Sequence, residues 1–249
     1  MTNSYVPRLI ILGCVCLAGL NLGTEARAQT PVDREVRQIV TFSSLPGQMS
    51  EALRIYRDEA IPIYRETEAL ISFRGFGERE SPVPLDLMIV SAFNGMAGMD
   101  NAGTQQRKIA ELRGTSIGAI YGRLGALTSG HTDQFIEMLP ALGAGDASST
   151  GLTAFVWYRL LPGRAGDFEY IIEHDLVPWE VDNVAGSATG RFLLSDGWDY
   201  LRMLAFDSLG DYQEYWSSAE ADANHSLISR ITVERREVLV SSMSDFSIR

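Results

Sequence analysis

The sequence predicts an α+β fold that consists of two tandem β-α-β-β-α-β units. The first observation is a repeat: residues 44–66 (SLPGQMSEALRIYRDEAIPIYRE) return 116 positions later as residues 160–182 (LLPGRAGDFEYIIEHDLVPWEVD). The match has no gap and keeps two prolines and a glycine in place, which indicates an internal duplication. The second observation is that each copy shows the same order of strand-like and helix-like patterns.

Each copy opens with a strand, followed by a turn and a helix. Residues 37–45 (RQIVTFSSL) and 153–161 (TAFVWYRLL) are rich in β-branched and aromatic residues, which favour strands. A Pro-Gly pair ends each strand with a turn. Apolar residues then recur at helical spacing, and we expect Pro62 and Pro178 to kink or end these helices because proline lacks a backbone N–H.

A strand pair, a second helix and, in the second copy, a closing strand complete the pattern. The strand pairs are expected at residues 70–78 with 85–93, and 187–195 with 200–208. The second helices are expected at residues 105–112 and 211–224, and the closing strand at residues 236–246.

In the first copy, residues 113–150 interrupt the pattern. Gly114, Gly118 and Gly122 predict a small-residue strand or helix that packs near the sheet. Residues 132–143 (TDQFIEMLPALG) predict a short helix, and residues 143–150 predict a linker.

The order of the elements is that of the ferredoxin-like fold. The Leu-Pro-Gly turn at residues 45–47 and 161–163, the proline-containing helix after it and the hairpin together resemble the dimeric α/β-barrel superfamily, above all NIPSNAP-like and antibiotic-biosynthesis-monooxygenase-like domains. The resemblance implies that the sheets of two such units pack face to face into a barrel with the helices outside. This chain would carry both units and form an intramolecular dimeric α/β barrel. Chlorite-dismutase-like proteins also join two such units, so the architecture fits several chemistries.

Residues 1–28 are predicted to be a secretory signal peptide. A basic N-terminal region precedes an apolar run over residues 9–22, and residues 26–28 form an Ala-x-Ala cleavage site. Cleavage after Ala28 would place the protein in the periplasm or outside the cell. A lipoprotein acylated at Cys14 is the alternative.

Removal of the signal would leave a first repeat with a C-terminal insertion (residues 29–150) and a second repeat (residues 151–249). Both cysteines leave with the signal, so we expect no disulfide or thiol chemistry. The formal net charge of −11 disfavours binding to nucleic acids and to anionic membrane surfaces. We therefore expect no nucleic-acid partner and no stable membrane anchoring, and a homodimer stays open.

The candidate catalytic residues, His225 and Asp175, both lie in the second repeat. Trp216 precedes His225 at a distance similar to that in antibiotic-biosynthesis-monooxygenase-like proteins, and the resemblance implies that His225 is an axial heme ligand or a proton shuttle. A helix-terminal histidine that interacts with the helix dipole is the alternative. Asp175 lies on the helix face expected to meet the sheet, where a raised pKa would suit a general base. Pairing with Arg159 or Arg202 is the structural alternative.

We expect Trp179, Trp216 and Tyr158 to shape a ligand pocket beside these two residues. No His or Cys pair has metal-ligand spacing, and the sequence contains no P-loop, dinucleotide fingerprint or Gly-x-Ser-x-Gly motif. We predict an exported small-molecule enzyme, monooxygenase-, isomerase- or lyase-like, that acts on a small apolar or aromatic substrate in a helix–sheet cleft, with heme or without a cofactor. A non-catalytic binder of a hydrophobic ligand such as heme, and a structural barrel module, are the alternatives.

Overall fold

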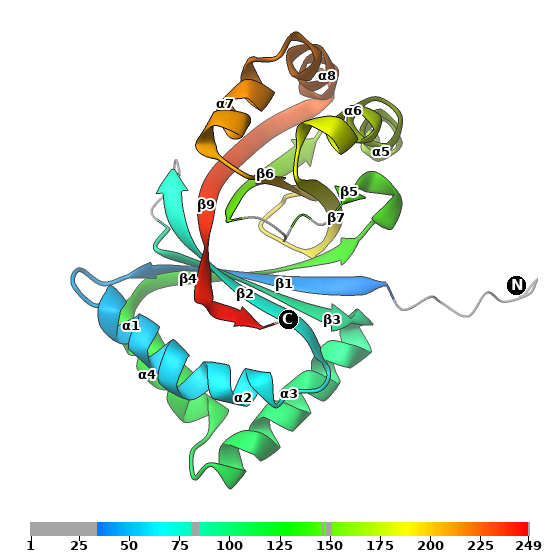
Figure 1. The fold of residues 1–249 in the computed structure, drawn as a ribbon. Helices are drawn as coiled ribbons and strands as arrows, with labels where there is room; N and C mark the ends of the chain where they lie inside the picture. Colours follow the sequence, from blue (N-terminus) through cyan, green and yellow to red (C-terminus); the bar gives the residue numbers. More distant parts are fainter. Residues whose placement is uncertain (1–33, 81–84, 146, 148–150, 249) are drawn as a thin grey trace, which may run out of the picture. The chain divides into compact units, whose positions relative to one another are not determined.

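The strands form one antiparallel sheet that closes into a barrel, with the helices outside it (Figure 1). The computed structural model describes residues 34–80, 85–145, 147 and 151–248, so the predicted signal peptide lies outside the described part of the chain. The sheet order is β4-β1-β3-β2-β9-β6-β8-β7-β5, and an additional pairing between β4 and β7 closes the ring.

The two repeats supply neighbouring strands in the same internal order, β4-β1-β3-β2 from the first and β9-β6-β8-β7 from the second. The first repeat consists of β1 (Glu35–Ser44), α1 (Met49–Ile55), η1 (Tyr56–Ala60), α2 (Ile61–Arg65), β2 (Leu70–Glu80), β3 (Leu87–Asn94), α3 (Gly95–Leu112), α4 (Ile117–Leu127) and β4 (Thr128–Met138). The second consists of β6 (Leu152–Leu160), α5 (Ala165–Ile171), η3 (Ile172–Leu176), α6 (Val177–Asn183), β7 (Gly186–Leu194), β8 (Tyr200–Phe206), α7 (Leu209–Ser217), α8 (Ala219–Ser229) and β9 (Thr232–Ile248). Between them lie η2 (Pro140–Leu142) and β5 (Ala144–Gly145). The predicted fold class is confirmed.

The Pro-Gly turns have the same geometry in both repeats. Gly47 and Gly163 have φ angles of +76° and +79°, in the region that glycine adopts without strain. In the first turn, the N–H of Gln48 donates to the carbonyl oxygen of Leu45 at 2.9 Å. A proline followed by a glycine with positive φ is the arrangement of a type II turn, which reverses the chain from strand to helix.

The helices do not end at the two prolines. A five-residue π-helical segment precedes each of them, and η1 and η3 begin 116 residues apart, at the spacing of the sequence repeat. The N–H of Ile61 donates to the carbonyl of Tyr56, and the N–H of Val177 donates to that of Ile172. Because a proline cannot donate, the wider turn shifts the hydrogen bonds by one residue and the helix continues as α2 or α6.

The predicted helix over residues 132–143 is wrong, because most of this segment belongs to strand β4. Gln134, Ile136 and Met138 are buried, whereas the residues between them are partly exposed, which is the period of a strand. The strand pairs with β1 on one side and with β7 on the other. The preceding small-residue segment is helix α4, and α3 begins at Gly95, ahead of the predicted start.

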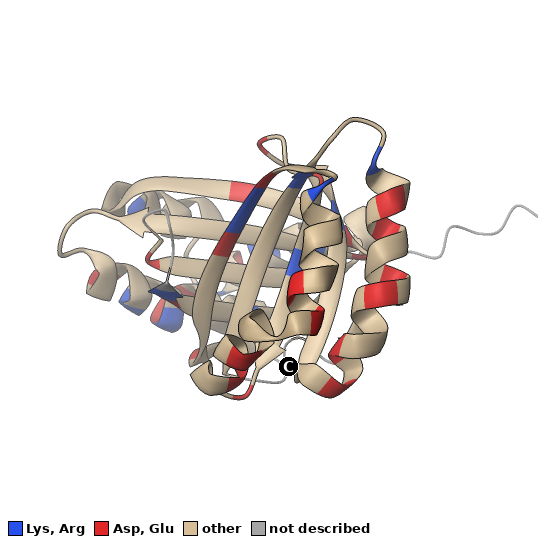
Figure 2. Cartoon of the chain, turned by 90° about the horizontal axis from the view of Figure 1, so that it is seen from above, with Lys and Arg blue, Asp and Glu red and all other residues tan. Residues whose placement is uncertain are grey.

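Side chains alternate between the barrel interior and the space under the helices. One apolar cluster fills the barrel interior. Each repeat has one further apolar cluster, which lies between the sheet and the helices of that repeat. Acidic side chains are carried mainly on the helices (Figure 2). Among the described residues, Glu180 and Arg202 are the charged side chains that are fully buried. None of the helices in the described ranges is long and apolar enough to span a bilayer.

Candidate functional site

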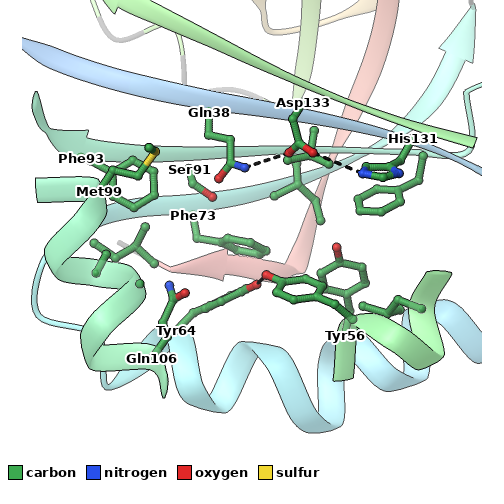
Figure 3. A pocket seen from close by; sticks show the side chains of 18 of the residues that line it. Gln38, Tyr56, Tyr64, Phe73, Ser91, Phe93, Met99, Gln106, His131 and Asp133 are labelled. Carbon is green, nitrogen blue, oxygen red and sulfur yellow. Dashed lines mark hydrogen bonds and ion pairs between the residues drawn. The ribbon is translucent and has the colours of Figure 1, made fainter. Parts of the chain in front are cut away.

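The first repeat encloses a cavity of about 440 Å³ between its helices and the outer face of its strands. The helices contribute three tyrosines and Gln106, and the strands contribute apolar side chains together with Gln38 and Ser91 (Figure 3). Aromatic rings line much of the cavity: Phe42, Tyr56, Tyr64, Phe73, Phe93, Tyr121 and Phe135. A cavity of this size, mostly apolar and with a few polar groups, has the properties of a small-molecule site.

The three tyrosines present neutral phenols on the helix side of the cavity. Burial raises the pKa of Tyr56, Tyr64 and Tyr121 above the ordinary value of a phenol, so all three keep their protons at neutral pH. The hydroxyls of Tyr64 and Tyr121 are hydrogen-bonded to each other. Since one of them accepts in this bond, its own O–H is available to donate to a ligand oxygen.

A histidine and an aspartate lie on the opposite wall, at the mouth of the cavity. His131 and Asp133 are two residues apart on β4 and therefore share a face. The Oδ2 atom of Asp133 lies 3.3 Å from Nε2 of His131, and Oδ1 accepts a hydrogen bond of 2.8 Å from Gln38. His131 stacks on Phe42, with a distance of 6.0 Å between the ring centroids. The carboxylate and the ring of Phe42 thus orient the imidazole, an arrangement found in acid–base sites.

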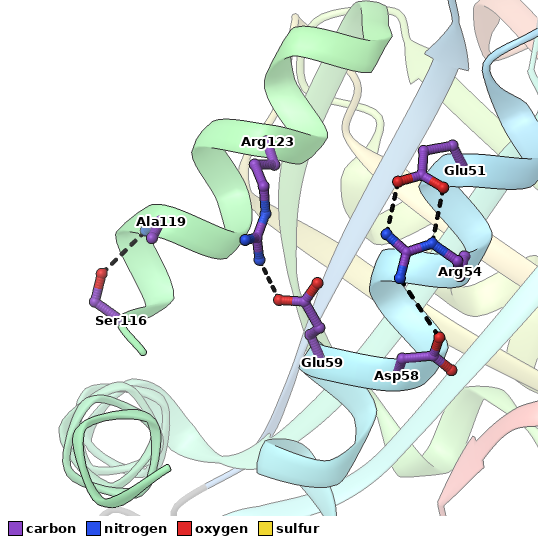
Figure 4. Close-up of polar contacts among 7 residues, drawn as sticks. All are labelled: Glu51, Arg54, Asp58, Glu59, Ser116, Ala119 and Arg123. Atoms are coloured by element: carbon purple, nitrogen blue, oxygen red, sulfur yellow. Dashed lines mark hydrogen bonds and ion pairs between the residues drawn. The ribbon is translucent and has the colours of Figure 1, made fainter. Parts of the chain in front are cut away.

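Polar contacts fix the helical wall of the cavity (Figure 4). Arg123 of α4 forms an ion pair with Glu59 of η1, which joins the helices that carry Tyr121 and Tyr56. Ser116 caps α4 by accepting a hydrogen bond of 3.1 Å from the N–H of Ala119. On the neighbouring helix, Arg54 bridges Glu51 and Asp58. The Arg123–Glu59 pair is thus the contact that links the carriers of two of the three phenols.

The equivalent space in the second repeat is filled. Arg202 lies opposite Val156 in the sheet, as Ile89 lies opposite Val40, so Arg202 is the counterpart of Ile89. Both Arg202 and Glu180 are 0 % exposed, and the guanidinium donates two hydrogen bonds to the carboxylate, at 2.9 and 2.6 Å. Burial opposes the ionisation of Glu180, but Arg202 holds the pKa of this carboxyl below its usual range.

Two aromatic side chains of α7 narrow this space further, and Trp216 also lines the pocket described below. Residues of β3 and β8 that occupy equivalent positions are 113 residues apart, as Ile89 and Arg202 are. When the same offset is extended into the helices that follow, Tyr215 and Trp216 correspond to Ala102 and Gly103 of the first repeat. Tyr215 donates a hydrogen bond of 3.0 Å to Glu180. At these two positions the first repeat has Ala102 and Gly103, whose smaller side chains leave the cavity open.

Asp175 is not the buried carboxylate of the second repeat. It lies partly exposed on η3, whereas Glu180, five residues later, is fully buried. The wider turn of η3 displaces the residues after it from the 3.6-residue spacing on which the prediction rested. Trp179 packs on Tyr215 at 5.0 Å between ring centroids and is not part of the pocket that contains His225.

The structure does bring together the other three predicted residues. His225, Trp216 and Tyr158 line a pocket of about 520 Å³ beside α8 and β9. The rings of Trp216 and His225 are 4.6 Å apart, and Nε2 of His225 lies 3.2 Å from the hydroxyl of Tyr215. Burial, together with the charges of Arg202 and Arg235, lowers the pKa of His225 to about 3, so the imidazole is neutral. His225 lies within α8 rather than at its end, so the helix-dipole interpretation is wrong.

The residues around His225 do not fit a heme as they are placed. Nε2 contacts Tyr215, and Nδ1 is buried without a hydrogen-bond partner, so neither nitrogen faces an open coordination position. Much of the pocket wall is polar: Asp222, Ser226, Ser229, Thr232, Glu234 and Arg235. Within the described ranges, no group of three or more His, Cys, Asp and Glu side chains is placed to hold a metal ion.

The sequence pattern does not single out the polar groups of the first-repeat cavity. The helix predicted over residues 132–143 includes Asp133 and begins after His131, whereas both residues lie on strand β4. The alternating apolar residues of the segment HTDQFIEM were the available signal, since a period of two places both polar groups on one face. Tyr121 lay in the glycine-containing segment, where no chemistry was expected.

No family model matches the sequence, and no curated protein is detectably similar to it in sequence. Solved structures are similar in fold. A candidate monooxygenase from Lactobacillus acidophilus superposes with a TM-score of 0.60 over 86 % of this chain and 95 % of its own, at 7 % identity. An anthrone oxidase-like protein gives 0.62 over 85 % and 92 %, at 9 % identity. A point mutant of chlorite dismutase from Candidatus Nitrospira defluvii gives 0.55 over 85 % and 92 %, at 10 % identity. The chain therefore has the dimeric α/β-barrel fold, while identities of this size carry no statement about activity.

Proposed function

We propose that this protein is an enzyme that removes a proton from a small aromatic substrate bound in the cavity of the first repeat. The observation that carries the proposal is the arrangement of this cavity, with neutral phenols on one wall and a His–Asp pair on the other. The aromatic lining favours a planar substrate. The phenols favour one with an oxygen that becomes more negative during the reaction.

The proposed roles follow from the protonation states. His131 accepts the proton, and Asp133 holds the imidazole in position. The phenols of Tyr64 and Tyr121 cannot act as bases at neutral pH because burial raises their pKa values. They act instead as hydrogen-bond donors to the enolate or phenolate oxygen that forms.

We favour an oxygenase-type reaction that begins with this removal of a proton. A CH₂ group activated by aromatic rings and a carbonyl loses a proton to His131, and the resulting carbanion adds O₂. Loss of water then gives a second carbonyl, so one O₂ is consumed and one water is released. The fold shared with candidate monooxygenases and an anthrone oxidase-like protein supports this reaction class. Isomerase- or lyase-type reactions would begin from the same carbanion.

Anthrone is a suitable first probe, because its CH₂ group lies between two aromatic rings and opposite a carbonyl. Oxygen uptake and product absorbance would be measured for the wild type and for His131→Gln, Tyr64→Phe and Tyr121→Phe. We expect His131→Gln to lower the rate about 10²–10⁴-fold, the typical contribution of a general base. His174→Gln, which changes an exposed histidine of the other repeat, is the matched control. Turnover by His131→Gln at the rate of the wild type would contradict the proposal. Binding of anthrone by the wild type without turnover would favour the non-catalytic alternative.

Export is part of the proposal and has its own test. Residues 1–28 support export, and the N-terminal sequence of the protein recovered from its host should begin at Gln29. Heme ligation by His225 is not part of the proposal, because neither nitrogen faces an open coordination position. Incubation with hemin should give no Soret band that depends on His225, and a band that is lost in His225→Ala would contradict this expectation.

A further inference from the structure

A third cavity, of about 330 Å³, lies at one end of the barrel interior. Its walls are inward-facing positions of strands, which follow from the alternation that places Ile39, Phe155 and Val238 in the interior cluster. The first repeat contributes Thr41, Ser43, Leu85, Met88, Gly130, His131, Thr132 and Gln134, and the second contributes Trp157, Asp196, Trp198, Arg236 and Val238. This cavity lies on the other side of the sheet from the proposed active site, and His131 borders both.

Arg236 is an unusual cation for this position. Its guanidinium lies 4.6 Å from the ring of Trp157 and 5.1 Å from that of Trp198. Within the described part of the chain it forms no direct ion pair, and its Nε atom is buried without a hydrogen-bond partner. Burial lowers the pKa of Arg236, because the charged form loses solvation there, and the nearby carboxylates of Glu234 and Asp196 offset only part of this effect. A partly buried N–H donor without a partner is costly for the fold.

Arg159 provides a comparison on the same indole. Its guanidinium also lies 5.1 Å from Trp198, but it is paired with Glu234 at 2.7 Å and donates to the carbonyl of Gly197. Stacking on tryptophan is thus not the feature that distinguishes Arg236. The distinguishing features are its unsatisfied N–H and its position in an enclosed cavity.

The wall opposite Arg236 is rich in hydrogen-bonding groups. The hydroxyls of Thr41 and Thr132 are 2.6 Å apart, and Gln134 accepts a hydrogen bond of 2.9 Å from Trp157. Thr132 is the counterpart of Arg236 in the repeat, because Thr132 lies directly opposite Thr41 and Arg236 lies directly opposite Trp157, and Thr41 and Trp157 are 116 residues apart. The two repeats therefore place hydroxyls on one side of the cavity and a cation with two indoles on the other.

We propose that this end of the barrel binds a small carboxylate with an apolar body, whose oxygens are held by the guanidinium of Arg236 and the facing hydroxyls. Arginine binds the planar carboxylate through parallel N–H donors, and the stacked indoles leave the edge of the guanidinium as its free side. Leu85, Met88 and Val238 would contact the apolar body. The site is independent of the proposed reaction.

Benzoate and its neutral isostere benzamide are the probes that test this proposal. Binding to the full chain would be measured by calorimetry and by the fluorescence of the tryptophans stacked on Arg236. A charge-assisted hydrogen bond predicts that benzoate binds about 10–100-fold more tightly than benzamide. Arg236→Gln should abolish this preference, whereas Arg159→Gln should retain it. Tyr64→Phe should also retain it, which separates this site from the cavity of the first repeat.

Three results would overturn the proposal. The first is equal binding of benzoate and benzamide by the wild type, and the second is unchanged benzoate binding by Arg236→Gln. The third is no binding of either probe at millimolar concentration. If Arg236→Gln does not fold, Arg236→Lys takes its place, because it keeps the charge but loses the paired donors, and we expect it to weaken benzoate binding selectively.

Discussion

Removal of one partner from the buried pair Glu180–Arg202 should destabilise the protein strongly. Both side chains are 0 % exposed, so Glu180→Met leaves the guanidinium of Arg202 charged and uncompensated in the core. Breaking a buried ion pair in this way costs about 3–5 kcal/mol. This is a large part of the roughly 5–15 kcal/mol by which a domain is usually stable. Arg202→Met should cost a similar amount, because it leaves the carboxylate unpaired.

The double variant Glu180→Met/Arg202→Met should be less affected than the sum of the single variants. It removes both charges, although the hydroxyls of Tyr215 and Thr189 lose a partner, at about 1–3 kcal/mol for each group left unsatisfied. We therefore expect the double variant to be no less stable than either single variant. The free energy of coupling between the two sites should be at least about 2 kcal/mol.

Urea unfolding followed by circular dichroism would measure these free energies, with a check that the m-value is unchanged. Asp167→Asn, which breaks the exposed pair with Arg164, is the control and should cost less than about 1 kcal/mol. Because the pKa of Glu180 is lowered in the folded state, its contribution is present above the ordinary carboxyl pKa. That contribution is lost as the pH falls through the lowered value. Single variants that each cost less than about 1 kcal/mol, or strictly additive effects, would refute this reasoning.

Three further predictions concern single positions. Gly103→Trp should fill the cavity of the first repeat and abolish anthrone binding, which calorimetry would measure. The fold should be retained, because a Cβ at this position meets only ordinary contacts, and circular dichroism would check this. Gly75→Ala should destabilise the protein by about 1–3 kcal/mol, since its Cβ would lie 2.6 Å from that of Phe246. Gly77→Ala should be tolerated, and thermal unfolding of the two variants would compare their stabilities. The pKa of His225 is lowered to about 3, so the unfolded chain binds a proton that the folded chain does not, and stability should decline as the pH falls from about 6.5 towards 3. His225→Asn should show a flatter decline in urea titrations over this range, and a profile identical to that of the wild type would contradict this assignment.

The repeat was enough to predict the fold, because turns and strand patterns are local and occur twice. Gly47 and Gly163 each adopt the positive φ angle that a Pro-Gly turn requires, so the two copies supported the same interpretation. The site was harder to predict, because a cavity forms where large side chains are lacking. Nothing local distinguishes Gly103 as the position where the second repeat has Trp216, and the burial of Glu180 depends on a π-helical turn that periodicity does not reveal. The chemistry of His131 and Asp133 depended on a strand whose partners lie far away in sequence.

The joining of both halves in one chain has a consequence for how such a barrel can evolve. When two identical subunits form a barrel, symmetry places every mutation in both halves, so a bulky residue that closes one chamber closes its twin. Here each half of the barrel has its own stretch of one chain, so a substitution changes only one half. The space between the helices and β8 is occupied by an arginine, a glutamate and a tyrosine, while the corresponding space beside β3 is open. One half is thereby free to specialise in stability while the other is free to change its chemistry.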